Sequence, residues 1–163
     1  YRPEVVPSRL SNITLYLQTL AVPARRNVND PEVKRGEQLF SQANCSVCHV
    51  PELRTAGRTA IPAAADLAIH AYTDLLLHDM GEALADGRPE FLADGREWRT
   101  PPLWGIGLSE TANGAGAFLH DGRARNFKEA ILWHGGEAAS AKQRAAELSA
   151  EDRAALISFL ESL

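Results

Sequence analysis

The chain contains only two cysteines and one methionine in 163 residues, and it lacks a long uncharged hydrophobic run. Two cysteines are too few for the disulfide framework that stabilises many small secreted domains. The apolar stretch over 74–80 is short and carries charge, whereas a membrane-spanning helix needs about 18 apolar residues. The sequence therefore predicts no membrane span.

An excess of positive charge is also lacking. Lys and Arg number 17 against 21 Asp and Glu, which gives a formal net charge of −4. Because nucleic-acid-binding domains usually present a basic face to phosphates, we expect no nucleic-acid partner. The chain shows neither an initiator methionine nor a signal peptide, and we expect it to be a processed or excised piece. Its length suits one globular domain.

Apolar periodicity and capping residues predict helices along much of the chain and no convincing strand. Asp30 is a cap before Pro31, and Asn126 and Ser149 are each followed three residues later by an acidic residue, as in a capping box. Long loops separate the helices, which suggests that they wrap something other than their own side chains. The predicted helices span 8–20, 30–40, 126–136 and 149–163, with a short one near 63–70, and the loops span 50–72 and 84–98.

Gly36 lies inside the predicted helix over 30–40, where glycine costs about 0.5–1 kcal/mol relative to alanine. Close approach of another helix would compensate for this cost. We therefore predict that Gly36 and Phe40 lie where this helix crosses the C-terminal helix.

Both cysteines lie in the sequence CSVCH, as Cys45 and Cys48, with His49 directly after the second. This C-x-x-C-H pattern is a signature of covalent haem attachment. Each thiol can form a thioether with one porphyrin vinyl group, and the His49 imidazole can bond the iron. The sequence therefore predicts one covalent haem c, held by Cys45, Cys48 and His49. Such a large flat cofactor also explains the long loops, because it supplies part of the core.

Three other interpretations of the cysteines fit less well. A structural zinc site commonly takes four ligands, and the sequence holds no further cysteine and no histidine pair at i, i+4. A thioredoxin-like redox pair requires a βαβ context, which is lacking. A disulfide across a two-residue gap closes a very small loop and stabilises little.

The iron of an electron-transferring haem needs a second axial ligand. Met80 is the single methionine and lies in a predicted loop that ends at Gly81. A methionine thioether paired with histidine raises the reduction potential, which suits electron transfer, so we predict Met80 as this ligand. His78 is the main rival, followed by His70 and His120. Without such a ligand the iron could itself bind peroxide.

Arginine and tryptophan side chains after residue 95 are candidates for haem contacts. Haem propionates are carboxylates, which arginine binds with two-point geometry. Arg99 is preferred over Arg96 because it precedes the stiff TPP segment. Trp98 and Trp104 are candidates for the haem edge, with ordinary packing as the alternative. We predict Arg99 and Trp104 as haem-binding residues.

Six stretches cover nearly the whole chain in order and carry a family resemblance: LYLQTLAVPARR, RGEQLFSQANCSVCHVP, LLLHDMG, EWRTPPLWGIGL, FLHDGRARNFKEAILWHGGEA and LSAEDRAALISFLESL. They resemble the C-terminal haem domain of peroxidase-like di-haem oxidoreductases, relatives of bacterial di-haem cytochrome c peroxidases and MauG-type enzymes. The resemblance implies an all-α, cytochrome-c-like haem domain over 30–163 with long loops. Residues 1–29 are then an N-terminal helical extension and a connector to a missing upstream domain.

The resemblance also implies a periplasmic protein with two haem domains, of which one passes electrons and the other meets peroxide. It assigns Cys45, Cys48, His49 and Met80 to the electron-transferring haem. The chain holds one haem motif rather than two, so the peroxidatic domain is expected outside it. The expected partners are that upstream haem domain and a small redox protein that donates electrons.

The predicted function is one-electron transfer through a covalent haem c, within a di-haem peroxidase-like oxidoreductase. A free-standing single-haem electron carrier without enzymatic activity is the alternative, and a haem-bearing interaction module without turnover is a third possibility. A second C-x-x-C-H motif upstream of Tyr1 would favour the oxidoreductase, whereas a signal peptide directly before Tyr1 would favour the carrier.

Overall fold

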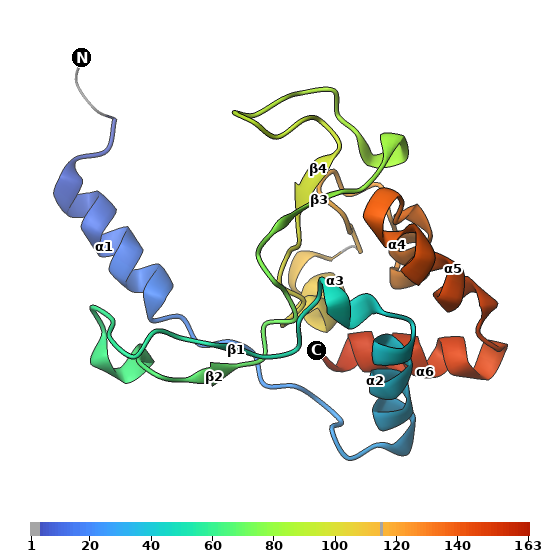
Figure 1. The fold of residues 1–163 in the computed structure, drawn as a ribbon. Helices are drawn as coiled ribbons and strands as arrows, with labels where there is room; N and C mark the ends of the chain where they lie inside the picture. Colours follow the sequence, from blue (N-terminus) through green and yellow to red (C-terminus); the bar gives the residue numbers. More distant parts are fainter. Residues whose placement is uncertain (1–3, 115) are drawn as a thin grey trace.

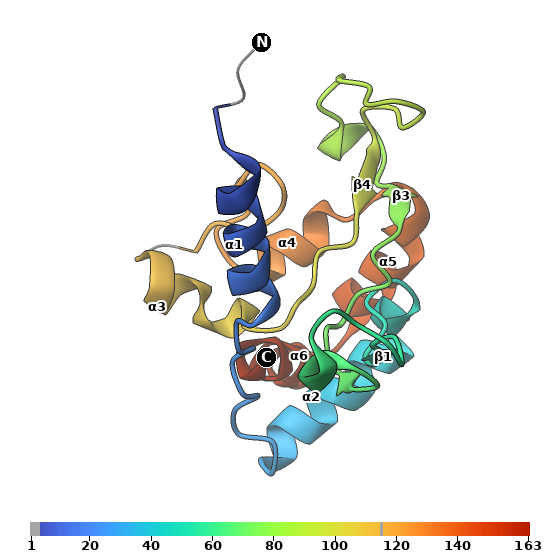
Figure 2. The same cartoon turned by 90° about the vertical axis from the view of Figure 1, so that its left-hand side faces the viewer.

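The computed structural model describes residues 4–114 and 116–163, which form helices and two small antiparallel sheets (Figure 1). The helices α2 and α6 pack together, while α1 stands apart from them (Figures 1 and 2). The helices are α1 (Pro7–Gln18), α2 (Pro31–Gln42), α3 (Ser109–Asn113), α4 (Phe127–Trp133), α5 (Ala139–Glu147) and α6 (Ala150–Ser162). The strands are β1 (Leu53–Arg54), β2 (Ala68–Ile69), β3 (Leu77–Asp79) and β4 (Glu97–Arg99).

The expected all-α fold is wrong, because the described residues include two strand pairs. β1 pairs antiparallel with β2, and β3 pairs antiparallel with β4, with His78 opposite Trp98. These strands have two or three residues each, too few for the alternation of apolar and polar residues that predicts a strand. The expected helix near 63–70 is also wrong, since a single 3₁₀ turn at Pro62–Ala64 precedes β2.

The helices α1, α2, α4 and α6 lie close to their predicted positions, and the predicted caps form. The Asn126 side chain accepts a hydrogen bond from the Glu129 N–H at 2.9 Å, and Ser149 accepts one from the Asp152 N–H at 3.1 Å. The sequence did not predict α3 or α5. In α5 the structure buries a single side chain, that of Ala145, so no apolar stripe marks this helix.

The core forms where α2 crosses α6, as predicted. A Cβ added to Gly36 would lie 1.9 Å from the Ala155 carbonyl oxygen, so only glycine allows this approach. The rings of Phe40 and Phe159 pack nearby with centroids 5.2 Å apart. The buried cluster consists of Val33, Phe40, Tyr72, Leu103, Ala145, Leu156, Phe159, Leu160 and Leu163.

The connector before α2 contacts the core, whereas α1 does not. No residue of α1 is buried, and its apolar face is exposed. Arg25 forms a two-point ion pair with Glu37, with distances of 2.9 and 2.8 Å, and the Arg26 N–H donates to the Ser162 carbonyl at 2.7 Å. The division of the chain at residues 29 and 30 stays a prediction. No helix in the described parts has the length and hydrophobicity to cross a membrane.

Candidate haem-binding site

The two cysteines and the following histidine lie on a single turn directly after α2. A 3₁₀ turn covers Cys45–Val47, and the His49 N–H donates to the Cys45 carbonyl at 3.0 Å. Asn44 starts the turn with a φ of 68°, a left-handed conformation that asparagine tolerates better than most residues. The two thiols are free, and Cys45 packs against the buried cluster. This turn therefore presents both sulfurs and the imidazole together.

The electrostatic setting of the thiols does not favour redox exchange between them. Burial raises the pKa of the Cys45 thiol to about 11, and burial also raises the pKa of Cys48. Reactive and disulfide-exchanging cysteines need a lowered pKa, because the thiolate is the nucleophile. At neutral pH both groups are therefore protonated thiols.

His49 is oriented and kept neutral by its surroundings. Its Nδ1–H donates to the Tyr72 carbonyl at 3.1 Å, which leaves the lone pair on Nε2. Metal-bound histidines usually donate their second ring nitrogen in this way. Burial lowers the pKa of His49 to about 4, so the ring is neutral at pH 7. Two thiols and an imidazole with a free Nε2 on one turn fit a covalently attached haem c.

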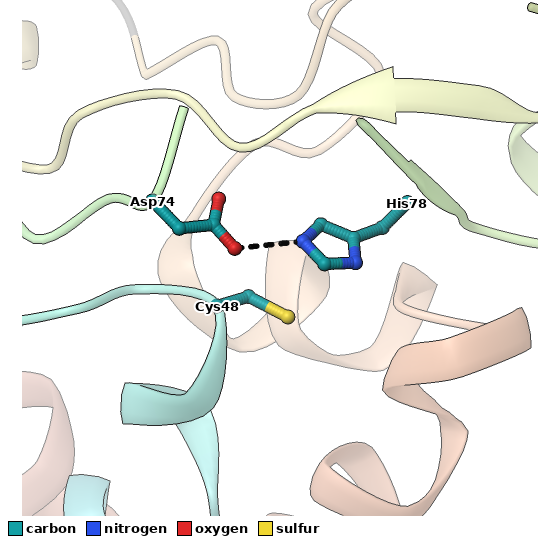
Figure 3. A group of neighbouring side chains, drawn as sticks. All are labelled: Cys48, Asp74 and His78. Carbon is teal, nitrogen blue, oxygen red and sulfur yellow. Dashed lines mark hydrogen bonds and ion pairs between the residues drawn. The ribbon is translucent and has the colours of Figure 1, made fainter. Parts of the chain in front are cut away.

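His78 lies beside Cys48 and the Asp74 carboxylate (Figure 3), and the Glu137 carboxylate contacts its other ring nitrogen. Its Nε2 is 2.8 Å from Asp74 and its Nδ1 is 2.8 Å from Glu137. A histidine that donates from both nitrogens is an imidazolium and has no lone pair for a metal. The ligand atoms of Cys48, Asp74 and His78 lie within 4.8 Å of one another. Structural zinc sites have four ligands, so this trio is better described as an ion pair beside a thiol.

The ion pairs of His78 should make folding stability depend on pH. The hydrogen bond to Glu137, followed by that to Asp74, raises the pKa of His78 above its unfolded value of about 6.5. The contribution of protonated His78 to folding stability is therefore fully present below about pH 6.5 and is lost as the pH rises through the raised pKa. We expect the free energy of unfolding to fall by on the order of 1 kcal/mol as the pH rises through the pKa of His78. We expect the His78→Gln variant to lack this fall. Thermal unfolding of the haem-loaded chain from pH 6 to pH 9 measures this.

Glu137→Gln serves as the matched variant for this experiment. Because Glu137 is the largest cause of the raised pKa of His78, its neutralisation should shrink the same pH-dependent loss. An identical pH dependence in the original chain and both variants would contradict the assignment of the loss to His78.

Met80 directly follows β3 and is a half-buried residue. Its N–H donates to the Arg96 carbonyl at 2.9 Å. A Cβ added to Gly135 would lie 2.8 Å from the Met80 carbonyl oxygen, so the segment after α4 packs against this backbone. These contacts describe the main chain of Met80. Its binding to iron stays a prediction.

Arg99 and Trp104 have different surroundings. Arg99 is the last residue of β4, is exposed, and donates to the Leu75 carbonyl. Trp104 lines a groove of about 520 Å³ together with Tyr72 and Leu163. Tyr72 connects this groove to the haem motif, because its carbonyl accepts the hydrogen bond from His49. Contacts of Arg99 and Trp104 with haem stay predictions.

The sequence did not predict two pairs of neighbouring rings that involve histidine. The ring centroids of His134 and His49 are 6.4 Å apart. His120 stacks on Trp98 with centroids 3.5 Å apart and an angle of 11° between the planes. The Gly-Gly pair after His134 marks the end of a helix, but it does not predict which rings lie near His134. Only the tertiary structure brings these rings together.

Comparisons with known proteins support a haem cofactor for this chain. A family model described as “Di-haem oxidoreductase, putative peroxidase” matches residues 3–163. No curated protein matches the chain. A solved structure of hydrazine synthase from Kuenenia stuttgartiensis, pressurised with xenon, is similar in fold, with a TM-score of 0.62 and 20% identity. The match covers 97% of this chain and 56% of that chain, so the chain spans little more than half of this neighbour.

The family model and the C-x-x-C-H turn point to the same cofactor. The match extends over almost the entire sequence rather than over the haem motif alone. A haem-based redox function follows from this membership, and the residues around His49 fit such a group. The chain belongs to the di-haem oxidoreductase family.

Proposed function

We propose that the chain carries one covalent haem c and transfers single electrons as one domain of a larger peroxidase-like oxidoreductase. Haem iron supplies the redox chemistry by alternating between its ferric and ferrous states. The polypeptide attaches the group through Cys45 and Cys48 and holds the iron through His49. The observation that carries the proposal is the turn that presents both thiols beside an imidazole with a free Nε2.

The surroundings of His49 support a relay. The Tyr72 carbonyl that orients His49 belongs to a residue packed against Phe40 and Phe159, with centroids 6.0 and 5.7 Å apart. A ligand held by a packed core changes its position little between oxidation states of the iron. This keeps the reorganisation energy of electron transfer small. Such rigidity suits electron transfer better than the binding and release of a substrate.

The partners and location are part of the proposal. The family is di-haem, and the chain holds one C-x-x-C-H motif, so we propose an upstream haem domain of the same parent protein as its redox partner. A small redox protein supplies the electrons, and the location is periplasmic, as the family resemblance implies. The presence of the parent protein in a periplasmic fraction would test the location.

Spectroscopy of the chain produced with c-type haem maturation tests the relay. We expect a pyridine haemochrome spectrum that corresponds to one covalent haem per chain, together with a reversible one-electron wave in voltammetry. If a protein side chain fills the second axial position, carbon monoxide should leave the reduced spectrum unchanged. Rapid binding of carbon monoxide and a fast reaction with peroxide would instead favour an open iron and an enzymatic site. Absence of covalent haem would refute the proposal.

A free-standing single-haem carrier is the second candidate, because the chain by itself holds a complete attachment motif. The sequence of the parent protein upstream of Tyr1 separates the two candidates. A second C-x-x-C-H motif favours the oxidoreductase, whereas a signal peptide directly before Tyr1 favours the carrier.

A further inference from the structure

We infer that His134 is the second axial ligand of the haem iron and that two histidines, His49 and His134, hold it. This inference rests on the proposed function, because it requires the haem attached at Cys45 and Cys48. It assigns to His134 the position for which the sequence predicts Met80.

The separation of the two rings carries the inference. Two imidazoles that bind one metal ion from opposite sides through Nε2 have ring centres roughly 6–6.5 Å apart, because each bond is about 2 Å and each ring adds about 1 Å. The centroids of His49 and His134 are 6.4 Å apart, with 53° between the planes. Tilted rings in ordinary packing reach a similar distance, as Phe40 and Tyr72 do at 6.0 Å, so the inference depends in addition on which ring nitrogens carry the lone pairs.

The hydrogen bonds of His134 repeat those of His49. The Nδ1–H of His134 donates to the Ala130 carbonyl at 2.7 Å, one helical turn earlier in α4, as the Nδ1–H of His49 donates to Tyr72. Each bond leaves the lone pair on Nε2, where it can meet a metal.

The backbone after His134 is held in place by β3. A Cβ on Gly136 would lie 2.1 Å from the Asp79 carbonyl oxygen, and Glu137 accepts a hydrogen bond from the Asp79 N–H at 3.0 Å. The segment that carries His134 therefore has little freedom to move. Such support from neighbouring groups is expected for a ligand that must keep one position.

The other histidines named as rivals are engaged elsewhere. Both nitrogens of His78 contact carboxylates, and His120 stacks on Trp98. His70 lines the groove that holds Trp104.

Spectra and reduction potentials of the haem-loaded original chain and of three variants test the inference. The original chain should be low-spin without the far-red sulfur-to-iron absorption band, and Met80→Leu should keep both its spectrum and its potential. His134→Ala should lose the low-spin signal in electron paramagnetic resonance and regain it with added imidazole. His134→Met should acquire the far-red band and a higher potential, because a thioether ligand favours the reduced iron.

Several results would overturn the inference. A far-red band in the original chain that disappears in Met80→Leu assigns the position to Met80. An unchanged low-spin spectrum in His134→Ala means that the two rings are close through packing alone. If His134→Ala fails to fold, His134→Met decides, and its failure to gain the far-red band counts against the inference. Covalent haem measured on every variant separates this outcome from failure of the proposed function, in which the original chain also carries none.

Discussion

Replacing Gly36 with leucine should separate α2 from α6 and lower the stability of the haem-loaded chain. The added Cβ would meet the Ala155 carbonyl carbon and oxygen at 2.6 and 1.9 Å, and backbone atoms cannot rotate away as a side chain can. Overpacking a filled core costs about 1–3 kcal/mol, and we expect at least the upper value here. Each kcal/mol lowers the thermal midpoint of a domain of this size by about 2–4 °C, so we expect a loss of at least about 6 °C.

Gly57→Leu is the matched control for this experiment. Gly57 lies in the loop between β1 and β2, where a Cβ would have no neighbour within 4 Å. Substitutions at such open positions usually change stability by less than about 0.5 kcal/mol. Calorimetry of both variants measures the difference, and equal midpoints would show that the α2–α6 crossing does not need glycine at residue 36.

Removal of both thiols, by Cys45→Ala together with Cys48→Ala, should abolish covalent haem. Without sulfur no thioether forms, and after denaturation the haem should separate completely from the chain. Each single variant should retain haem through one thioether. Its pyridine haemochrome band should move to longer wavelength, because one vinyl group stays conjugated with the porphyrin. Haem staining of denaturing gels and the haemochrome spectrum provide the measurements.

Val47→Ala is the control for the cysteine variants, since Val47 lies between the two cysteines in the sequence and is 68% exposed. It should keep the full haem content and the band position of the original chain. Haem that stays attached in the double variant would exclude thioether attachment and, with it, the proposed function.

Sequence reasoning predicted the features that depend on neighbouring residues. The side chains of Asn126 and Ser149 cap α4 and α6 through bonds to residues three positions later, and such bonds can be read from the sequence. Gly36 is unusual in a helix whatever surrounds it, which pointed to a close helix crossing. The C-x-x-C-H spacing is likewise a local pattern, since one turn of backbone places both thiols and the imidazole.

The prediction of no strands was wrong for a physical reason. β3 and β4 have three residues each, and their pairing joins Leu77–Asp79 to residues at the far side of a long loop. A segment of this length shows no periodicity of its own. Helix α5 escaped prediction in a similar way, since most of its residues are small or polar and only Ala145 is buried.

The sequence by itself determined that two thiols and His49 share one turn, because covalent spacing and local backbone bonds decide this without help from the rest of the chain. Tertiary structure alone decided which groups meet that turn. It placed the Tyr72 carbonyl on His49, enclosed His78 between Asp74 and Glu137, and brought His134 to 6.4 Å from His49. Contacts between distant segments depend on how helices and strands pack, and no local pattern encodes them.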